Sequence, residues 1–482
     1  MAKSSGSRIA RQALISGMVA LVATPVLADD LREALVMAYN TNPSLQAARA
    51  QQRAVDEGVP IARAPGLPSV SGTATYSEFI ETSLDSPLAP QRNLDAAVNL
   101  GVPIYAGGGI RNSVNAAKTR VVAGQADLRA VESGVFSQVV ATYMDVILAE
   151  AVVKLNRANV QRLEVNLQAT RDRFEIGDLT RTDVAQSASR LALAQGQTRS
   201  AEANLIAARE RYIQVIGKAP QDLATPPALQ GLPGSADEAV GVALDSNPDL
   251  IAARERSKAA GYDTAAANAR RLPQVSVFAR SGYNDYLGSN KLPQVAQSTT
   301  DTSVGVRATV PLYQGGLPSA QKRQAQAREG AVLEQEIGVE RQVIASVRAA
   351  FAQWQAAQSL TVSSQTAVDA AELSLEGVRA ENTVGNRTIL DILNAENERL
   401  NAQVQLVTAK RNAYVAGFNL LAAMGKAEAR DLGLDGGTLY DPEVNARRAR
   451  NSVWDWNDNP KPKPASTRTV DSKAQDGSVA DQ

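Results

Sequence analysis

The chain contains 482 residues with 50 basic and 50 acidic side chains, so its net charge of zero gives no indication of nucleic-acid binding. It has neither cysteine nor histidine, which excludes disulfides and thiolate metal sites and closes the common routes to zinc binding and to serine–histidine catalysis. Aromatic residues make up only 4%, fewer than a compact globule of this size would bury, and this composition favours long, closely packed helices.

Residues 1–28 have the pattern of a cleaved secretory signal peptide. Arg8 and Arg11 precede an apolar run over 13–23, and the small Ala28 stands at the expected cleavage site. The apolar run is shorter than the roughly 20 residues that a membrane-spanning helix needs. We expect no later segment to be apolar enough for a membrane helix. The mature chain is then periplasmic, secreted or an outer-membrane barrel, whose strands give only a weak hydropathy signal.

The rest of the chain reads as two similar halves, 29–217 and 235–425. An Asn-Pro-x-Leu motif at Asn42 recurs at Asn247, 205 residues later. Val-Pro-(Ile/Leu)-Tyr, followed by a Gly-Gly pair, begins at Val102 and recurs 208 residues later. A nearly constant offset over such a distance predicts an internal repeat with matched helix lengths.

Each half begins with one expected helix of about 30 residues, over 30–64 and 235–271, which a Leu-Pro pair ends because proline restricts the residue before it. Two strands of alternating apolar and polar residues follow in each half, predicted over 67–82, 94–104, 272–284 and 301–312. A barrel strand between lipid and water requires this period of two, and a half-buried strand of a soluble sheet shares it.

A very long helix comes next in each half, over 109–174 and 317–382, which at about 1.5 Å per residue is roughly 100 Å long. Helices of this length pair as coiled coils. Return helices are expected over 180–217 and 388–424, each beginning with Thr and Asp at capping-box spacing. Two connecting segments rich in proline and glycine, 218–234 and 426–440, and a polar tail over 441–482 that we expect to be disordered complete the chain.

These doubled motifs, with the turn sequences 173–177 and 384–389, resemble the TolC family of outer-membrane factors over nearly the whole mature chain. The resemblance implies an α+β membrane protein in which three protomers, four strands each, close a twelve-stranded outer-membrane barrel continued by a periplasmic coiled-coil barrel. Four strands alone would leave edges in lipid, and eight would be filled by their own side chains. The segments 218–234 and 426–440 would form a belt around the middle of the tunnel.

The resemblance also implies an entrance gate at the tips of the helical hairpins. Arg387 matches the gate arginine, and Thr182 and Asp183 match its partners on the neighbouring hairpin. A guanidinium bonded to a carboxylate and a hydroxyl across subunits would hold the entrance shut. The alternative is an ordinary solvated charge pair at a helix end, which contributes little.

The sequence departs from the family pattern at two gate positions. Asn382 stands where a tyrosine is expected, and Asn394 stands where a second acidic residue is expected. Asp391 is thereby left as the single acidic residue of the inner ring, which gives three charges in a trimer and a weaker cation preference than six.

The turns between long and return helices resemble the sites where periplasmic adaptor proteins dock, although glycine in a tight turn needs no function to explain it. The predicted docking residues are Gly177, Asp178, Leu179, Thr180, Gly385, Asn386 and Thr388.

The predicted function is a passive exit duct of a tripartite efflux pump or type I secretion system, located in the outer membrane with a large periplasmic portion and without lipidation. It would bind no cofactor and catalyse nothing. Because the sequence has no phosphate-binding loop, an inner-membrane ABC or proton-driven transporter and a periplasmic adaptor would supply the energy. Three alternatives remain at this stage: a secreted or surface coiled-coil structural or adhesive protein, a periplasmic adaptor, and an enzyme that works with carboxylates alone.

Overall fold

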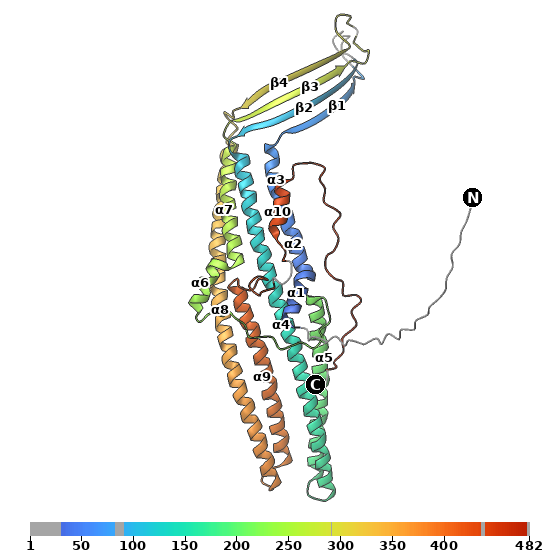
Figure 1. Cartoon of the computed structure of the whole chain (residues 1–482), viewed down its shortest axis with the longest axis vertical. Coiled ribbons are helices and arrows are strands. Elements are labelled where there is room, and N and C mark those ends of the chain that lie inside the picture. Colours follow the sequence, from blue (N-terminus) through green and yellow to red (C-terminus); the bar gives the residue numbers. More distant parts are fainter. Residues whose placement is uncertain (1–29, 82–90, 291, 435–438, 480–482) are drawn as a thin grey trace, which may run out of the picture.

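The computed structural model describes residues 30–81, 91–290, 292–434 and 439–479. The predicted signal peptide over 1–28 lies outside these residues. The molecule is elongated, with a four-stranded sheet at one end and two helical hairpins whose tips point away from it at the other (Figure 1). Figure 1 also shows short helices and irregular segments gathered around the middle of the long helices.

The first helix of each half is broken, contrary to the single helix of about 30 residues that the sequence predicted. In the first half the elements are α1 (Leu31–Thr41), α2 (Pro43–Asp56), α3 (Gly58–Arg63) and a short 3₁₀ turn, η1 (Ala64–Gly66); in the second they are α6 (Ala236–Ser246) and α7 (Pro248–Ala269). The break that both halves share falls at Asn42 and Asn247, whose ψ angles of 125° and 121° are extended. A residue that precedes proline avoids the helical region, and proline opens the next helix.

The Asn-Pro-x-Leu motif does more than start a helix. The Asn42 side-chain oxygen accepts hydrogen bonds from the amides two and three residues on, at 2.9 and 3.3 Å, and its Nδ2 donates to the Val215 carbonyl at 2.9 Å. Asn247 caps its helix in the same way and donates to the Ala423 carbonyl at 2.9 Å. Each buried asparagine therefore ties the first helices of its half to the end of the return helix.

We expect Asn42→Ala to lower the free energy of local opening of α1 and α2 by about 1–2 kcal/mol, because it removes a helix cap and leaves a buried carbonyl without a donor. Hydrogen exchange of the amides in this region measures the effect. Asn42→Asp separates the two roles, since it keeps the capping oxygen and loses the donor. Asn40→Ala, at an exposed position two residues away, is the control, and equal exchange in the two alanine variants would contradict the assignment.

The sheet consists of β1 (Ser69–Glu78), β2 (Arg92–Ala106), β3 (Gln274–Asp285) and β4 (Ser298–Thr309), paired antiparallel in that order. Each strand begins and ends within four residues of the predicted bounds. The two halves join through β2 and β3, whose register shifts between Pro103 and Tyr105, as expected where proline supplies no ladder donor. Among the described residues, β1 and β4 each have one edge without a partner strand.

The long helices α4 (Gly109–Glu175) and α8 (Leu317–Thr383) contain 67 residues each, so the predicted matched lengths are confirmed. Their return helices are α5 (Arg181–Ile216) and α9 (Ile389–Ala423). α4 follows directly on two glycines, Gly107 and Gly108, with φ angles of 61° and 79°. These left-handed conformations turn the chain from strand to helix at little steric cost only for glycine.

The main core lies halfway along the helices and gathers several of the chain's few aromatic side chains. Tyr39 stacks on Phe136 with ring centroids 6.2 Å apart, and Tyr143 lies 6.4 Å from Tyr212. The expectation that no later segment is apolar enough for a membrane helix is wrong for α4, which has one stretch of sufficient length and composition. Of that stretch, 44% is buried inside the protomer, and the middle of α4 supplies side chains such as Val140 to this core.

The expected disordered tail contains an ordered helix, α10 (Pro442–Asn451), which packs on α2 and α3. Beyond it the chain runs back along the molecule to α5, where Arg209 donates to the carbonyls of Asp476 and Ser478 at 2.9 and 2.8 Å. The buried face of α10 is made by two alanines, Ala446 and Ala449, among polar and charged residues. Two small side chains give too weak a helical period to be recognised from the sequence.

Candidate functional site

The two hairpin tips, at the end of the molecule opposite the sheet, have the same backbone geometry. Gly177 and Gly385 have φ angles of 83° and 80°, and each helix ends with a pair of hydrogen bonds typical of a Schellman motif. In the first tip the Asp178 amide donates to the Arg173 carbonyl at 2.9 Å. The turns project apolar side chains into solvent: Ile176 is 80% exposed and the equivalent Val384 is 70% exposed.

The predicted capping boxes begin both return helices. The hydroxyl of Thr180 accepts from the Asp183 amide at 3.3 Å, while the Asp183 carboxylate accepts from the Thr180 amide at 2.9 Å. Thr388 and Asp391 repeat both bonds at the same distances. The Thr180 hydroxyl and amide lower the pKa of Asp183, and the Thr388 amide and hydroxyl lower the pKa of Asp391. Both carboxylates are therefore charged at neutral pH.

Within one protomer, Arg387 bonds to a residue of its own hairpin. Its Nε donates to the Glu381 carboxylate at 2.6 Å, and this hydrogen bond and the nearby charge raise the pKa of Arg387. Asn382 donates through Nδ2 to the Arg387 carbonyl at 2.7 Å, so it stabilises the turn. Thr182 and Asp183 lie on α5 of the other hairpin, and among the described residues neither bonds to Arg387.

Asn394 links the two hairpins. Its side-chain oxygen accepts a hydrogen bond from Arg190 Nη2 at 2.9 Å, which joins α9 to α5. The sequence indicated this position only as a departure from a family pattern. The structure shows that the neutral amide still provides an acceptor for a guanidinium of the neighbouring hairpin.

An ionic cluster built around a buried carboxylate lies beside this link, and no sequence motif indicated it. Glu396 of α9 is only 1% exposed and is surrounded by three arginines from three helices. Arg162 Nε of α4 lies 3.3 Å from its carboxylate, Arg399 Nη2 of α9 lies 3.0 Å away, and Arg379 of α8 makes a short ion pair with the other oxygen. Glu396 and Arg399 are three residues apart, the spacing of an ordinary surface pair on a helix. Arg162 lies 234 residues before Glu396 in the chain, so the sequence does not indicate their contact.

The cluster carries more positive than negative charge. Burial lowers the pKa of Arg162, and the neighbouring Arg399 lowers it further. Arginine nevertheless stays protonated in proteins, so three cations share one carboxylate. Arg162 Nη2 and Arg399 Nε are buried without a hydrogen-bond partner. Because buried charges must be paired, Glu396 is the residue that makes this arrangement of α4, α8 and α9 possible.

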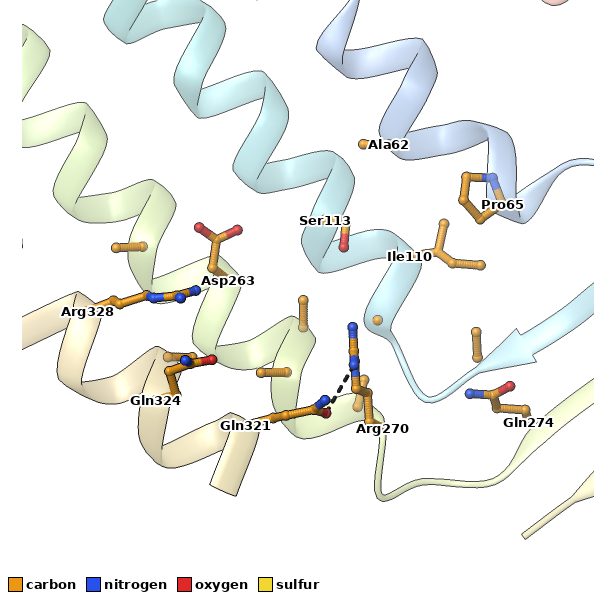
Figure 2. A pocket seen from close by; sticks show the side chains of 17 residues that line it. Ala62, Pro65, Ile110, Ser113, Asp263, Arg270, Gln274, Gln321, Gln324 and Arg328 are labelled. Carbon is orange, nitrogen blue, oxygen red and sulfur yellow. Dashed lines mark hydrogen bonds between the residues drawn. The ribbon is translucent and has the colours of Figure 1, made fainter. Parts of the chain in front are cut away.

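A hollow of about 610 Å³ lies where the helices pass into the strands. Figure 2 shows Ala62, Pro65 and Ile110 on one side, and on the other Arg270, which bonds to Gln321 at 3.0 Å. Ser113 also lines the hollow. The sequence contains no histidine that could act as a general base for this serine. The described part of the chain contains no group of three potential ligands that could hold a metal ion.

Comparison with known proteins gives one consistent result. The family model described as outer membrane efflux protein matches residues 34–218 and 239–426, once in each half. Outer membrane efflux protein BepC of Brucella suis is 32% identical over 443 residues, which cover 92% of this chain and 95% of that protein. Outer membrane protein TolC of Escherichia coli is 26% identical over 426 residues, 84% of each chain.

The fold agrees with solved structures. The crystal structure of the Campylobacter jejuni CmeC outer membrane channel superimposes with a TM-score of 0.72 at 17% identity, covering 87% of this chain and 89% of that one. The family model spans most of the chain, and the relative with 32% identity extends over nearly all of it. This chain belongs to the outer membrane efflux protein family.

Proposed function

We propose that the chain is one subunit of a homotrimeric, passive exit duct that spans the outer membrane and the periplasm. The family is that of outer membrane efflux and secretion channels. The observation that carries the trimer is the open sheet, because β1 and β4 each keep an unpaired edge. Lipid does not tolerate such edges. Three four-stranded sheets joined edge to edge close a barrel of twelve strands, wide enough for a conduit.

The two halves of the protomer support a duplicated architecture. Both long helices have 67 residues, the same asparagine motif caps the start of the second helix of each half, and both tips have the same turn. A trimer then contains six similar hairpins, which can continue the barrel as a periplasmic tunnel. Cleavage of residues 1–28 would deliver the unlipidated chain to the outer membrane.

Two features support the proposed partners: the sequence lacks a phosphate-binding loop, and the hairpin tips expose apolar side chains. No phosphate-binding loop occurs in the sequence, so transport draws its energy from an inner-membrane ABC or proton-driven pump. The tips offer an adaptor two similar turns, Gly177–Thr180 and Gly385–Thr388, each beside an exposed aliphatic residue, Ile176 or Val384. Apolar side chains held in solvent on rigid turns support docking of another protein there.

Deleting the gene tests this function most directly. We expect the deletion strain to become sensitive to toxic compounds or to lose secreted proteins from the medium, and the cloned gene to restore them. The protein should fractionate with outer membranes and migrate as a trimer until it is heated. A monomer that fractionates with soluble periplasmic protein would instead support the coiled-coil structural alternative.

At the entrance, we propose that Asp391 of the three protomers forms a ring of charge and that Arg387 reaches Thr182 and Asp183 of a neighbouring subunit. Asp391 lies on the exposed first turn of α9, and its lowered pKa keeps it charged. A ring of carboxylates favours cations. The Asn382 amide, bonded to the Arg387 carbonyl, holds the turn where the resemblance implied a tyrosine latch.

We expect Asp391→Asn to reduce cation selectivity and block by divalent cations in bilayer conductance measurements. Asparagine keeps an oxygen that can cap the helix, so the charge is the main change. Asn394→Asp should have the opposite effect by adding a second acidic position. Since the pKa of Asp391 lies below the usual value of about 3.9, selectivity should persist as the pH falls to about 4 and be lost below it. Unchanged selectivity in Asp391→Asn would show that the ring is not at the constriction.

A further inference from the structure

Two of the three tryptophans of the chain lie on the turn that follows α10, and both are exposed. Trp454 is 72% exposed and Trp456 is 83% exposed, and Val453 beside them is also exposed. Tryptophan buries a large apolar surface when it can, and a cluster of exposed apolar side chains usually marks an interaction site. The exposed cluster of Val453, Trp454 and Trp456 therefore indicates an interaction site.

Hydrogen bonds hold the turn in place, so the exposure of the tryptophans does not result from a flexible backbone. Arg63 at the end of α3 donates to the Ser452 carbonyl at 3.0 Å. The Asn457 amide lies 3.3 Å from the Trp454 carbonyl, and Arg448 donates to the Asn459 side chain at 2.6 Å. These bonds fix the backbone from which the two rings project.

Side-chain contacts place the turn close to the sheet. α10 runs parallel to α2 and α3, since Asn445 bonds to Asp56 at 2.7 Å, Arg448 to Glu57 at 3.3 Å and Ser452 to Arg63. Arg63 lies only six residues before the start of β1 at Ser69. Figure 1 shows α10 beside α3, just below the sheet, with the chain rising toward the sheet before it descends along the helices.

We propose that residues 452–459 form a lipid anchor, in which Trp454 and Trp456 insert into the phospholipid surface of the inner leaflet of the outer membrane. This rests on the proposed function, which puts the sheet in the membrane and its helical end at the periplasmic boundary. Tryptophan prefers the interface of a membrane, where its ring is buried and its N–H is wet. Exposed Tyr105 and Tyr313 lie at the same end of the sheet, as in the aromatic girdles of outer-membrane barrels.

The charges around the turn fit the same partner. Arg447 and Arg450 on α10, and Lys461 and Lys463 after the turn, are exposed cations. The turn itself contains two exposed acidic residues, Asp455 and Asp458, whose negative charge partly offsets these four cations. Basic residues next to an inserted aromatic pair strengthen binding to anionic phospholipid headgroups. The anchor would fix the otherwise extended tail to the base of the barrel.

Fluorescence quenching by brominated phospholipids tests the anchor in the full chain reconstituted in vesicles of zwitterionic and anionic phospholipid. The Trp354→Phe variant leaves Trp454 and Trp456 as the only emitting tryptophans. We expect bromine near the headgroup end of the acyl chains to remove most of this emission, and bromine near the chain terminus to remove less. Val470→Trp, in a background without the three native tryptophans, is the matched tail control and should not be quenched, because its position is exposed and far along the tail.

A reporter in the sheet separates failure of the anchor from failure of the proposed function. In the same tryptophan-free background, Val304→Trp lies on the apolar face of β4 and should be quenched if the sheet is in lipid. Quenching at position 304 with none at Trp454 and Trp456 would overturn the anchor and leave the channel intact. A blue-shifted, unquenched tail emission would show that a protein surface covers the tryptophans, which also overturns it. If position 304 is unquenched as well, the proposed membrane insertion fails.

Discussion

Replacing Glu396 with alanine is expected to destabilise the helical part of the protein by about 1–3 kcal/mol, less than the loss of one partner from a fully buried ion pair, because the Arg379 side chain is half exposed. Three guanidinium groups from α4, α8 and α9 would be left facing one another with no carboxylate. Arg162 and Arg399 already have buried nitrogens without hydrogen-bond partners, and loss of the carboxylate would add to them. The effect should therefore exceed that of an ordinary surface substitution.

Hydrogen exchange along α4 and α9, together with the temperature at which the proposed trimer dissociates, measures this change. Glu398→Ala is the matched control, since Glu398 is exposed on the same helix two residues away, and we expect it to change stability by less than about 0.5 kcal/mol. Replacing Glu396 together with Arg162 and Arg379 by apolar residues of similar volume should restore much of the loss, because the unpaired charges are then also removed. Equal stability of the Glu396→Ala and Glu398→Ala variants would contradict the assigned role.

The cluster also bears on opening of the duct. It ties α4 of the first hairpin to α8 and α9 of the second, next to the Arg190–Asn394 link. If the second hairpin moves outward when the entrance opens, these contacts resist the movement within each protomer. We therefore expect Glu396→Ala to raise the resting conductance of the reconstituted channel as well.

Replacing Arg387 with alanine is expected to open the entrance by removing the proposed contact with Thr182 and Asp183 of the next subunit. Exposed ion pairs are individually weak, and three equivalent pairs would act together in the proposed trimer, so we expect the open fraction to rise roughly tenfold. Single-channel conductance and the entry of large antibiotics into cells measure the change. The difference from the unmodified protein should shrink at high salt, which screens exposed charges.

Glu381→Gln shows which partner of Arg387 matters. Within the protomer the arginine bonds to Glu381 at 2.6 Å. If this local pair closed the entrance, Glu381→Gln would open the channel as much as Arg387→Ala. The contact between subunits predicts instead that Glu381→Gln leaves the entrance closed, because Arg387 is then free to reach its neighbour. Asp183→Asn should open the entrance. A closed entrance in this variant would contradict the assignment of the gate residues.

Much of the fold follows from the sequence because its signals are local. Proline and glycine mark the ends of helices and strands, the period of two marks the strands, and the uninterrupted runs without proline mark the long helices. The capping boxes at Thr180 and Thr388 were predicted from a spacing of three residues and are present. The same local signals could also have predicted the helix breaks at Asn42 and Asn247, since an asparagine before proline strongly favours the start of a new helix.

The sequence by itself determined the strands, the long and return helices, their order in two matched halves, and the turn residues of the hairpin tips, because each depends on neighbours a few positions apart. Only the tertiary structure decided that Glu396 is buried among arginines, that Asn394 meets Arg190, and that α10 holds a tryptophan turn beside the sheet. These features join residues that are far apart in the chain, as the 234 residues between Arg162 and Glu396 illustrate. A charged side chain on a long helix looks the same in sequence whether it faces water or another helix, and only the packing of the helices settles which.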